Sequence, residues 1–333
     1  MGKLSPGSLK ELLKCVKTDS SVVIPPSSGF DSGVHLIDDK YLVISTDPCI
    51  GVPKEWFGWL LLNYASSDVA LFGAHPRYCT INLLGPPKTT SQTFLTIMKQ
   101  ICKAADEIQM TIITGHTGTY PGISTVVGVC TAYGIIEKDK LITPSGAKPG
   151  NLILCTKPIG LELAVNVALT KKKLANEIFG YERTKELRRL VKMQSCVHEA
   201  LQLAEAGCVD AMHDATEGGL TAALKEMAVA SNVGFKIDFE KIPVCEEARS
   251  LQRHFDLSDE QLLSMSSTGT IVASVKPTQD QQVTEILNKE GLSASFIGSF
   301  EKTKHQILFK DGKEMAFRAR SNDPYETILS GQL

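Results

Sequence analysis

One segment in the second half of the chain, His213 to Leu220, combines residue types that bind a phosphate together with a cation. It reads His-Asp-Ala-Thr-Glu-Gly-Gly-Leu, with Asp214 at the end of a predicted strand and two glycines that open a predicted helix. Such a turn can bring backbone N–H groups and a helix N-terminus to a phosphate, while carboxylates hold the cation. The alternative is an ordinary helix start with Thr216 or Asp214 as its N-cap.

Three aspartates of the first half have the surroundings expected of ligands for a hard cation. Asp31 lies in a Gly-Phe-Asp-Ser-Gly turn, Asp47 ends the predicted strand 41–46, and Asp68 interrupts an apolar helix. A carboxylate inside such a helix is costly unless it is paired or binds a cation. Magnesium takes one or two carboxylates together with phosphate oxygens, so the set predicts a Mg-nucleotide site. Taken singly, Asp31 and Asp47 are also common turn or cap residues.

A second glycine turn is predicted at residues 115–118, after the short buried strand 111–114. Gly115 lets the backbone approach a phosphate, His116 can donate an imidazole N–H, and Thr117 can donate its hydroxyl. A histidine in a loop is also common without any such role. The signatures G-x-x-x-x-G-K-[ST] and G-x-G-x-x-G are absent from the chain, so a nucleotide site would be built from aspartates and glycine turns.

Hydrophobic periodicity predicts the elements that position these residues. In the first half it predicts helices at 4–16, 55–72 and 91–109, and strands at 41–46, 77–84, 111–114 and 124–136. In the second half it predicts strands at 151–156, 209–212, 235–238, 270–275 and 295–297, helices from 162 and 184, at 197–206 and 220–231 and around 246 and 281, and a hairpin at 310–313. The pattern implies sheets covered by helices, an α+β class with α/β sandwich character. A loop-like composition near 144–150 predicts domains at 1–148 and 149–333, and the Pro/Ser/Gly-rich passage 24–29 is a candidate lid.

Composition narrows the classes of partner and compartment. With 43% hydrophobic and 22% charged residues, the chain is typical of a soluble globular protein. A formal net charge of -2 gives no electrostatic reason to expect binding to nucleic acid or to an anionic membrane. The nine cysteines form no C-x-x-C pair, which favours small buried side chains in a reducing cytosol. Residues 1–17 lack the apolar core of a signal peptide, so we expect a cytoplasmic protein.

Together these residues resemble the superfamily of aminoimidazole ribonucleotide synthetase (PurM). This superfamily includes the hydrogenase maturation factor HypE, selenophosphate synthetase, thiamine-monophosphate kinase and formylglycinamidine ribonucleotide synthetase. The start, Gly2-Lys3-Leu4-Ser5-Pro6, is similar to that of HypE and of related archaeal-type proteins. The remaining matches occur in the family's order: Gly29-Phe30-Asp31-Ser32, Thr46-Asp47, Ser67 to Pro76, Gly115-His116-Thr117, and Asp214 to Leu220.

The resemblance implies a two-domain PurM-like fold whose N-terminal sheet joins that of a second subunit in a barrel, hence a homodimer. It implies ATP and Mg2+ as cofactors and a small-molecule substrate, with an oxygen of that substrate phosphorylated or activated. The implied metal ligands are Asp31, Asp47, Asp68 and Asp214. Further implied cofactor-binding residues are Lys3, Gly115, Thr216, Gly218 and Gly219, and the catalytic candidates are His116, Thr117 and Glu217.

The departures from the family pattern leave other functions open. Phe30 replaces one of the family's paired aspartates, Ser67 replaces an Asn, and Glu217 replaces an Arg of HypE. HypE carries its thiocarbamate on a C-terminal cysteine, whereas no cysteine follows Cys245 here. A non-catalytic nucleotide-binding accessory protein in metalloenzyme maturation, with a maturation partner protein, is therefore the main alternative. A thiamine-monophosphate kinase-like or selenophosphate synthetase-like enzyme is a further one; for the latter, Cys15 lies on a predicted helix and lacks the motif around a reactive thiol.

Overall fold

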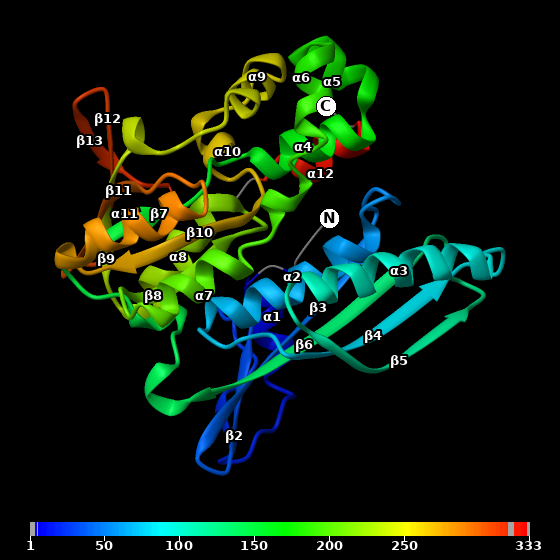
Figure 1. The fold of residues 1–333 in the computed structure, drawn as a ribbon. Helices are drawn as coiled ribbons and strands as arrows, with labels where there is room; N and C mark the ends of the chain where they lie inside the picture. Colours follow the sequence, from blue (N-terminus) through cyan, green and yellow to red (C-terminus); the bar gives the residue numbers. More distant parts are fainter. Residues whose placement is uncertain (1–3, 5, 319–322, 332–333) are drawn as a thin grey trace. The chain divides into compact units, whose positions relative to one another are not determined.

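The computed structural model describes residues 4, 6–318 and 323–331, so the predicted cofactor ligand Lys3 lies outside the described residues. The chain divides into two compact units (Figure 1). Leu13–Leu141 form the first, here the N-terminal unit. The described residues from Ile142 onward, with those up to Leu12, form the C-terminal unit. The domain boundary at residue 148 stays a prediction.

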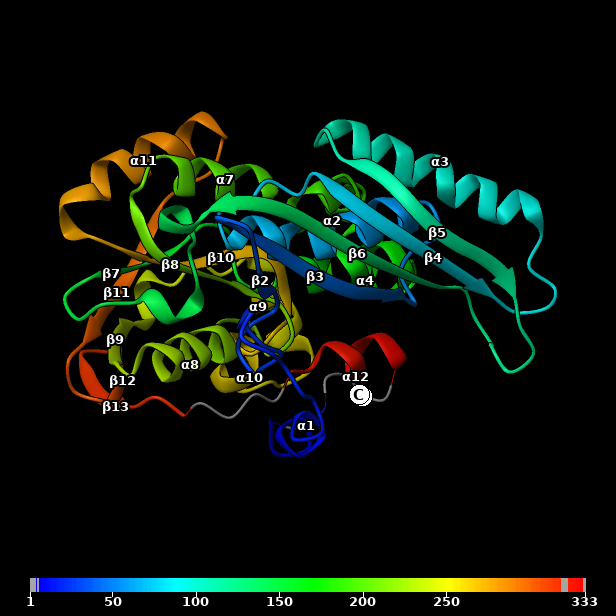
Figure 2. The ribbon, with the colours of Figure 1, turned by 90° about the horizontal axis from the view of Figure 1, so that it is seen from below.

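The N-terminal unit is a six-stranded sheet with the order β1-β2-β3-β6-β4-β5. Only the β4–β5 pair is parallel among these neighbours, and the other pairs are antiparallel. Helices α2 and α3 pack against each other and against the sheet, α3 alongside β4 and β5 (Figure 2). The elements are β1 (Val22–Ile24), β2 (Gly33–Ile37), β3 (Lys40–Ile50), α2 (Phe57–Leu71), β4 (Tyr78–Gly85), α3 (Ser91–Glu107), β5 (Thr111–Thr119), β6 (Val127–Glu137) and the 3-10 helix η1 (Lys138–Lys140).

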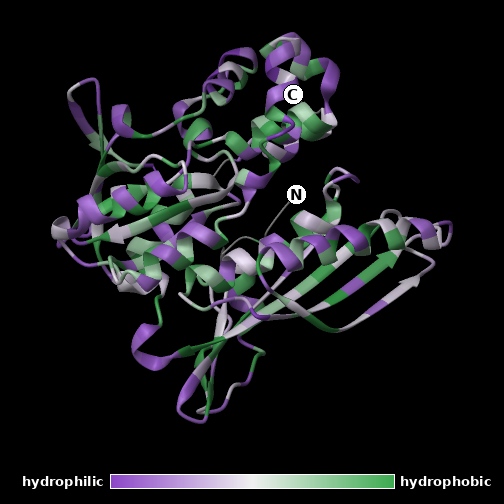
Figure 3. Ribbon diagram, in the orientation of Figure 1, coloured by the Kyte–Doolittle hydropathy of each residue, from purple (hydrophilic) through white to green (hydrophobic). Residues whose placement is uncertain are grey.

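The two helices of this unit differ in how their apolar residues are arranged. Along α3, hydrophobic and hydrophilic residues are interspersed (Figure 3), and Ile97, Ile101 and Ala105, at helical spacing, are buried. Helix α2 is apolar on all sides, and every one of its 15 residues except Tyr64 is buried. A helix of that kind belongs in the interior of a structure. Asp68 is therefore placed in a buried setting, as its apolar sequence context predicts.

The C-terminal unit contains a seven-stranded sheet with the order β13-β12-β9-β11-β7-β10-β8. Its strands are β7 (Leu152–Cys155), β8 (Val209–Ala215), β9 (Gly234–Asp238), β10 (Ser267–Val275), β11 (Ser295–Glu301), β12 (Gln306–Lys310) and β13 (Lys313–Ala316). Its helices are α4 (Leu161–Thr170), α5 (Lys172–Phe179), α6 (Tyr181–Leu187), α7 (Val197–Glu205), α8 (Gly219–Ser231), α9 (Glu246–His254), α10 (Asp259–Leu263), α11 (Asp280–Lys289) and α12 (Tyr325–Ser330), with η2 (Pro144–Gly146), η3 (Val191–Gln194), η4 (Phe239–Lys241) and η5 (Pro277–Gln279). Largely antiparallel sheets packed with helices confirm the predicted α+β class.

Two predicted boundaries in the N-terminal unit are wrong. Asp47 does not end a strand, because β3 continues through Pro48 to Ile50. Strand β2 pairs with β3 only as far as Ile44, so the rest of β3 has β6 as its one paired strand. An edge position of this kind tolerates a proline such as Pro48.

The segment that contains His116 is also not a turn. It continues as β5, which lies at the edge of the sheet, and none of its nine residues is buried. The prediction of a short buried strand followed by a glycine turn is therefore wrong. The glycine has a packing reason instead, since a Cβ at Gly115 would lie 2.1 Å from the carbonyl oxygen of Ile81 on β4.

The predictions for the cysteines are confirmed in part. Seven of the nine cysteines are buried, as predicted, whereas Cys15 and Cys102 are exposed. The prediction that Cys15 lies on a helix is wrong, because α1 (Pro6–Leu13) ends before it. Within the described part of the chain, no helix combines the length and the apolar composition needed to cross a membrane.

Candidate functional site

In the N-terminal unit, one serine connects two of the predicted metal ligands. The hydroxyl of Ser45, on β3, lies 2.7 Å from Oδ2 of Asp68 and 3.0 Å from the backbone carbonyl oxygen of Asp31. Ser45 is 3% exposed and Asp68 5% exposed, so this contact is sealed from bulk solvent. The structure thus brings the Asp31 turn, β3 and helix α2 together at one hydroxyl.

The third predicted ligand, Asp47, lies on the same face of β3. Residues two apart on a strand point to the same side, which places Asp47 beside Ser45 on the side that faces α2. The register agrees, because Asp47 pairs with buried Cys130 of β6. We call Asp31, Asp47, Asp68 and Ser45 the aspartate cluster. Ser45 lies in the predicted strand 41–46, but its sequence neighbours gave no sign of this bridging role.

The catalytic candidates His116 and Thr117 lie elsewhere in the same sheet. Through the pairs β3–β6, β6–β4 and β4–β5, Asp47 is in the same row as Gly115, three strands away. With strands about 4.8 Å apart, this is a separation of roughly 14 Å. His116 follows Gly115 and so points to the opposite face of the sheet. Within this unit the structure does not bring His116 to the aspartate cluster.

His116 has a local partner instead. Its Nε2 is hydrogen-bonded to the hydroxyl of Tyr120, just beyond the end of β5. The Tyr120 ring lies over Gly118, where a Cβ would meet the ring at 3.1 Å. Both His116 and Tyr120 are solvent-exposed. The imidazole is therefore held in one orientation while it remains accessible, which a hydrogen-bond donor to a ligand requires.

In the C-terminal unit, the predicted phosphate turn is formed at the junction of β8 and α8. Asp214 is the last residue but one of β8 and is 3% exposed. The hydroxyl of Thr216 donates to Oδ1 of Asp214 at 3.4 Å, while Glu217 is exposed. We call residues 214–219 the α8 turn.

The N-cap alternative for this turn is wrong. The N-cap of α8 is Gly218, not Thr216 or Asp214. Gly218 has a φ of 85° and Gly219 a φ of 56°, both in the left-handed region. A Cβ at Gly219 would also lie 2.5 Å from the carbonyl oxygen of Met265. Both glycines are thus required by the backbone.

A buried histidine fixes the strand end that carries Asp214. The Nδ1 of His213 is hydrogen-bonded to the carbonyl oxygen of Asp214 at 2.9 Å. Its Nε2 is hydrogen-bonded to Glu226 of α8 at 3.0 Å. This ring links the end of β8 to the second turn of the helix that follows, so the α8 turn is held on both sides.

Two acidic residues that sequence reasoning missed lie near the α8 turn. Oδ2 of Asp323 accepts a hydrogen bond from the Gly218 N–H at 3.1 Å. Burial raises the pKa of Asp323 to about 6. Burial also raises the pKa of Glu162, on α4, despite hydrogen bonds from Ser266 and Thr268. Asp323 is 105 positions from Gly218 in sequence, so no local motif could have signalled the contact.

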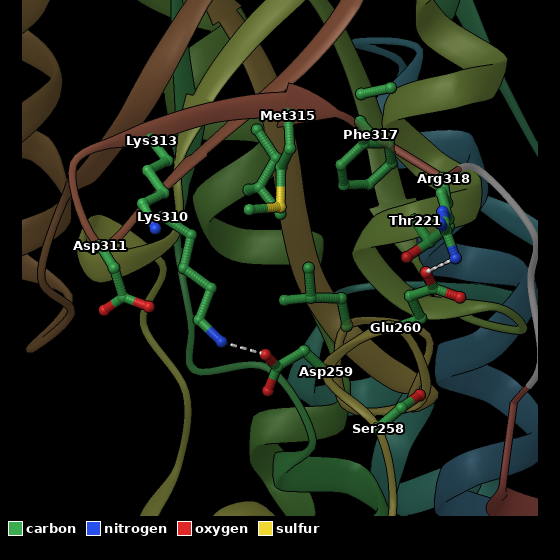
Figure 4. Close-up of a pocket in the computed structure, with 13 residues that line it drawn as sticks. Thr221, Ser258, Asp259, Glu260, Lys310, Asp311, Lys313, Met315, Phe317 and Arg318 are labelled. Carbon is green, nitrogen blue, oxygen red and sulfur yellow. Dashed lines mark hydrogen bonds and ion pairs between the residues drawn. The ribbon is translucent and has the colours of Figure 1, made fainter.

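A pocket of about 620 Å³ lies in the same unit, between α10 and the β12–β13 hairpin (Figure 4). Its apolar lining includes Leu263, Leu308 and Phe317. Lys310 points to Asp259 across one side, and Arg318 lies 3.5 Å from Glu260 on the other. Among the described residues, none of the predicted site residues lines it. Since Lys310 and Arg318 are each paired with a carboxylate, we do not assign the predicted phosphate chemistry to this pocket.

Comparison with solved structures defines the class of protein. The structure of the hydrogenase maturation protein HypE in complex with ATP superposes with a TM-score of 0.71, covering 95% of this chain and 91% of that one at 20% identity. The fold is therefore the two-domain PurM-like fold that the motifs predicted.

Sequence comparison then gives the family. The model of the AIR synthase related protein N-terminal domain matches residues 29–136, and that of its C-terminal domain matches residues 148–311. The chain belongs to the AIR synthase related protein family.

Two curated relatives extend over most of the chain. A protein of Methanocaldococcus jannaschii named "Putative hydrogenase expression/formation protein" is 26% identical over 314 residues, covering 91% of this chain and 90% of its own length. A selenide, water dikinase of Carboxydothermus hydrogenoformans is 24% identical over 341 residues, covering 92% and 95%. The predicted closeness to HypE-type proteins is confirmed.

Proposed function

We propose that this chain is an ATP- and Mg2+-dependent enzyme that phosphorylates, or activates by phosphorylation, an oxygen of a small-molecule substrate. The aspartate cluster carries the proposal, since it places a carboxylate inside an apolar helix against a serine hydroxyl shared with the Asp31 turn. Such a carboxylate is retained at a cost that cation binding would offset. Similarity to a selenide, water dikinase and to the structure of HypE with ATP supports ATP as the cofactor.

The donors of the aspartate cluster fit Mg2+. Carboxylate and hydroxyl oxygens are the ligands of a hard cation. Three thiols, those of Cys49, Cys79 and Cys130, lie on this face of the sheet. Burial raises the pKa of the Cys49 thiol, and the hydrogen bond with Cys79 together with burial raises that of the Cys130 thiol, whereas the same hydrogen bond lowers that of Cys79. Thiols kept protonated are poor ligands for softer metals. The chemistry of the cluster therefore favours magnesium over zinc.

Each residue has a defined part in this proposal. Asp31, Asp47 and Asp68 hold the ion, and the resemblance alone assigns Asp214 as a further ligand. When bound, Mg2+ neutralises charge on the phosphates. On the resemblance, Gly115, Gly218 and Gly219 let the backbone come close to phosphate oxygens. Thr216 would turn its hydroxyl from Asp214 to a phosphate oxygen.

The catalytic candidates act by hydrogen bonding and charge. On the resemblance alone, His116 and Thr117 are assigned as donors to the transferred phosphoryl group, since the N-terminal unit by itself keeps His116 apart from the aspartate cluster. Exposed Glu217 accepts a proton from the substrate. Transfer then depends on positioning and charge neutralisation, without a covalent enzyme intermediate. Lys3 remains a proposed cofactor-binding residue on the resemblance alone.

The face of the N-terminal sheet opposite α2 supports a homodimer as part of the proposal. Ile50, Tyr78 and Ile135 lie on that face and are 55%, 40% and 51% exposed. Large apolar side chains exposed along one face of a sheet mark a candidate surface for a partner to cover. Light scattering should give the mass of a dimer, and Ile135→Glu should shift it to a monomer. If the wild-type protein is a monomer, the proposed barrel formed by the sheets of two subunits is wrong.

The experiment that tests the function is incubation of the protein with Mg-ATP and a cell metabolite extract, followed by mass spectrometry. We expect one ATP-dependent product that carries phosphate or has lost water after phosphorylation. The matched control is the Asp68→Asn variant, which should give none. ATP binding without any product would instead favour the nucleotide-binding accessory protein, to which the similarity with a hydrogenase expression/formation protein points.

A further inference from the structure

The carboxylate of Asp323 is held by three backbone N–H groups from three different parts of the C-terminal unit. Oδ2 accepts from Gly218 at 3.1 Å, at the start of α8. Oδ1 accepts from Ser266 at 3.3 Å, just before β10, and from Tyr325 at 2.9 Å, on α12. One side chain thus joins the α8 turn to the sheet and to the last described helix.

Asp323 itself is firmly placed. The hydroxyl of Tyr325, two residues on, accepts a hydrogen bond from Nδ2 of Asn166 on α4 at 2.7 Å. Oδ1 of Asn166 in turn accepts from Gln194 at 3.1 Å. Asn166 and Gln194 are buried, and Ile328 of α12 is 2% exposed. Because these partners are fixed, Asp323 is a rigid support for the turn that it contacts.

The hydrogen bond from the Gly218 N–H to Asp323 affects the backbone shape of the α8 turn. Gly219 donates its own N–H to Thr216 at 2.8 Å, which closes the turn from within. Gly218 has a φ of 85°, which lets the chain change direction between Glu217 and the helix. Two successive glycines have more conformational freedom than other residues. A charged acceptor on one of their N–H groups restricts that freedom.

Burial and neighbouring acidic groups disfavour the charged form of Asp323. The carboxylate of Glu162, from α4, lies near enough to raise the pKa of Asp323 further. The charge of Asp214, on β8, in turn adds to the rise in the pKa of Glu162. Tyr325 and Glu326 are the titratable groups on the α12 side. A carboxylate kept among other acids, with only N–H groups to compensate, is an unfavourable choice for a purely structural link.

We propose that Asp323 is a positioning residue of the candidate phosphate site: by holding the Gly218 N–H it fixes the α8 turn in the shape that presents Asp214, Thr216 and the start of α8 to the nucleotide. This inference rests on the proposed function for its consequence, ATP affinity, but not for the contact itself. Asp323 does not touch the nucleotide in this scheme.

The test compares Asp323→Asn with the wild type in the full-length protein. The amide keeps the shape of the side chain but turns one of its two acceptor atoms into a donor. A matched control is Asp280→Asn, an exposed aspartate that also accepts a backbone N–H, from Gln281 at the start of α11. We expect affinity for a non-hydrolysable ATP analogue with Mg2+ to fall about tenfold in Asp323→Asn, as for loss of one charged hydrogen bond, and to stay unchanged in the control.

The pH dependence separates positioning from a general loss of structure. A protonated Asp323 resembles an Asn, so the advantage of the wild type over Asp323→Asn should be largest near pH 8 and shrink towards none below about pH 6. The ratio of the two affinities cancels the titration of the nucleotide itself. A ratio that does not change with pH, or a fall in affinity matched by the same fall in thermal stability, would overturn the proposal.

Hydrogen exchange keeps this test distinct from that of the proposed function. In the absence of nucleotide, the peptide containing Gly218 should exchange faster in Asp323→Asn than in the wild type. If it does and the wild type binds no ATP, the proposed function fails while the hold on the turn stands. If exchange is unchanged, the positioning role is wrong whatever the ATP affinity.

Discussion

The aspartate cluster and the α8 turn are built in opposite ways. In the aspartate cluster, side-chain carboxylates provide the chemistry, and a neutral hydroxyl, that of Ser45, holds Asp68 in place. In the α8 turn, two glycines with positive φ give the backbone its shape, and a carboxylate, that of Asp323, holds the N–H of Gly218. The first region depends on which residues are present and the second on which shape the chain adopts.

The difference predicts how each region responds to substitution. Changing a carboxylate of the aspartate cluster removes a proposed ligand and leaves the fold, because the strand and helix around it are set by apolar packing. Changing a glycine of the α8 turn alters the backbone and so affects stability as well as binding. Each prediction below tests one side of this comparison.

The largest effect is expected for Asp68→Asn. The substitution removes a buried charge from the aspartate cluster but keeps an oxygen that can accept the Ser45 hydroxyl. We expect affinity for Mg-ATP to fall by about 100-fold, close to 3 kcal/mol, while thermal stability is kept. Calorimetric titration measures this.

The control for that change is Asp106→Asn, on the exposed side of α3. It should bind Mg-ATP as the wild type does, and so should substitutions of single surface lysines. If Asp68→Asn and Asp47→Asn also bind Mg-ATP with the affinity of the wild type, the assignment of the aspartate cluster as a metal site is wrong.

The next effect is on stability and concerns the α8 turn. Gly219→Ala puts a Cβ on a residue with a φ of 56°, at 2.5 Å from the Met265 carbonyl oxygen. Gly207→Ala is the matched control, since Gly207 has a φ of 63° but nothing within 4 Å of an added Cβ. We expect about 1 kcal/mol of destabilisation in the control and about 2 kcal/mol more in Gly219→Ala. Urea denaturation of the two variants gives the difference, and equal losses would mean that the turn can shift to relieve the clash.

The sequence predicts those features of the two regions that depend on residues close to one another in the chain. The buried setting of Asp68 was predictable because the apolar residues of α2 surround it in sequence. The β8–α8 junction was predictable because an apolar run, an acidic residue and two glycines are consecutive. The fold class and the HypE-type resemblance were predicted from the same local motifs, and the family models and the solved structure confirm them.

What could not be predicted depends on contacts between distant segments. The continuation of β3 through Pro48 requires knowledge that β2 stops pairing at Ile44. The conversion of the Gly115 segment from a turn to an edge strand requires its pairing with β4, some 30 positions earlier. The roles of Ser45 and Asp323 depend on partners 23 and 105 positions away, which no local pattern encodes. The assignments of individual site residues, Glu217 and Lys3 included, stay predictions.

A smaller effect is expected at β5, which belongs to neither region. His116→Ala should lower turnover about tenfold, as for the loss of a hydrogen bond to a charged phosphoryl oxygen. Thermal stability should stay near that of the wild type, because His116 is exposed at a sheet edge. Tyr120→Phe sharpens the test, since it frees the imidazole from its hydroxyl partner without removing it. A joint loss of turnover and stability in His116→Ala would identify a structural histidine.

The smallest effect is a difference in pH dependence between the two regions, and it follows from Asp323. Burial raises the pKa of this carboxyl from 3.8 to about 6 in the folded protein. A raised carboxyl pKa favours the folded state most at low pH, below the unfolded value, and this contribution is lost as the pH rises through about 6. Asp323→Asn should therefore remove part of the decline in unfolding free energy between about pH 4 and pH 7. We expect a difference on the order of 1 kcal/mol, because the side chain keeps some contact with solvent.

Chemical denaturation of both proteins across that range measures the difference. Glu162, whose pKa is raised in the same direction, should account for part of the slope that remains in Asp323→Asn. Asp68→Asn provides the comparison from the aspartate cluster. If Asp323→Asn and the wild type show the same slope, burial does not raise the pKa of Asp323 above that of the unfolded chain, and the pH dependence expected of the α8 turn is wrong.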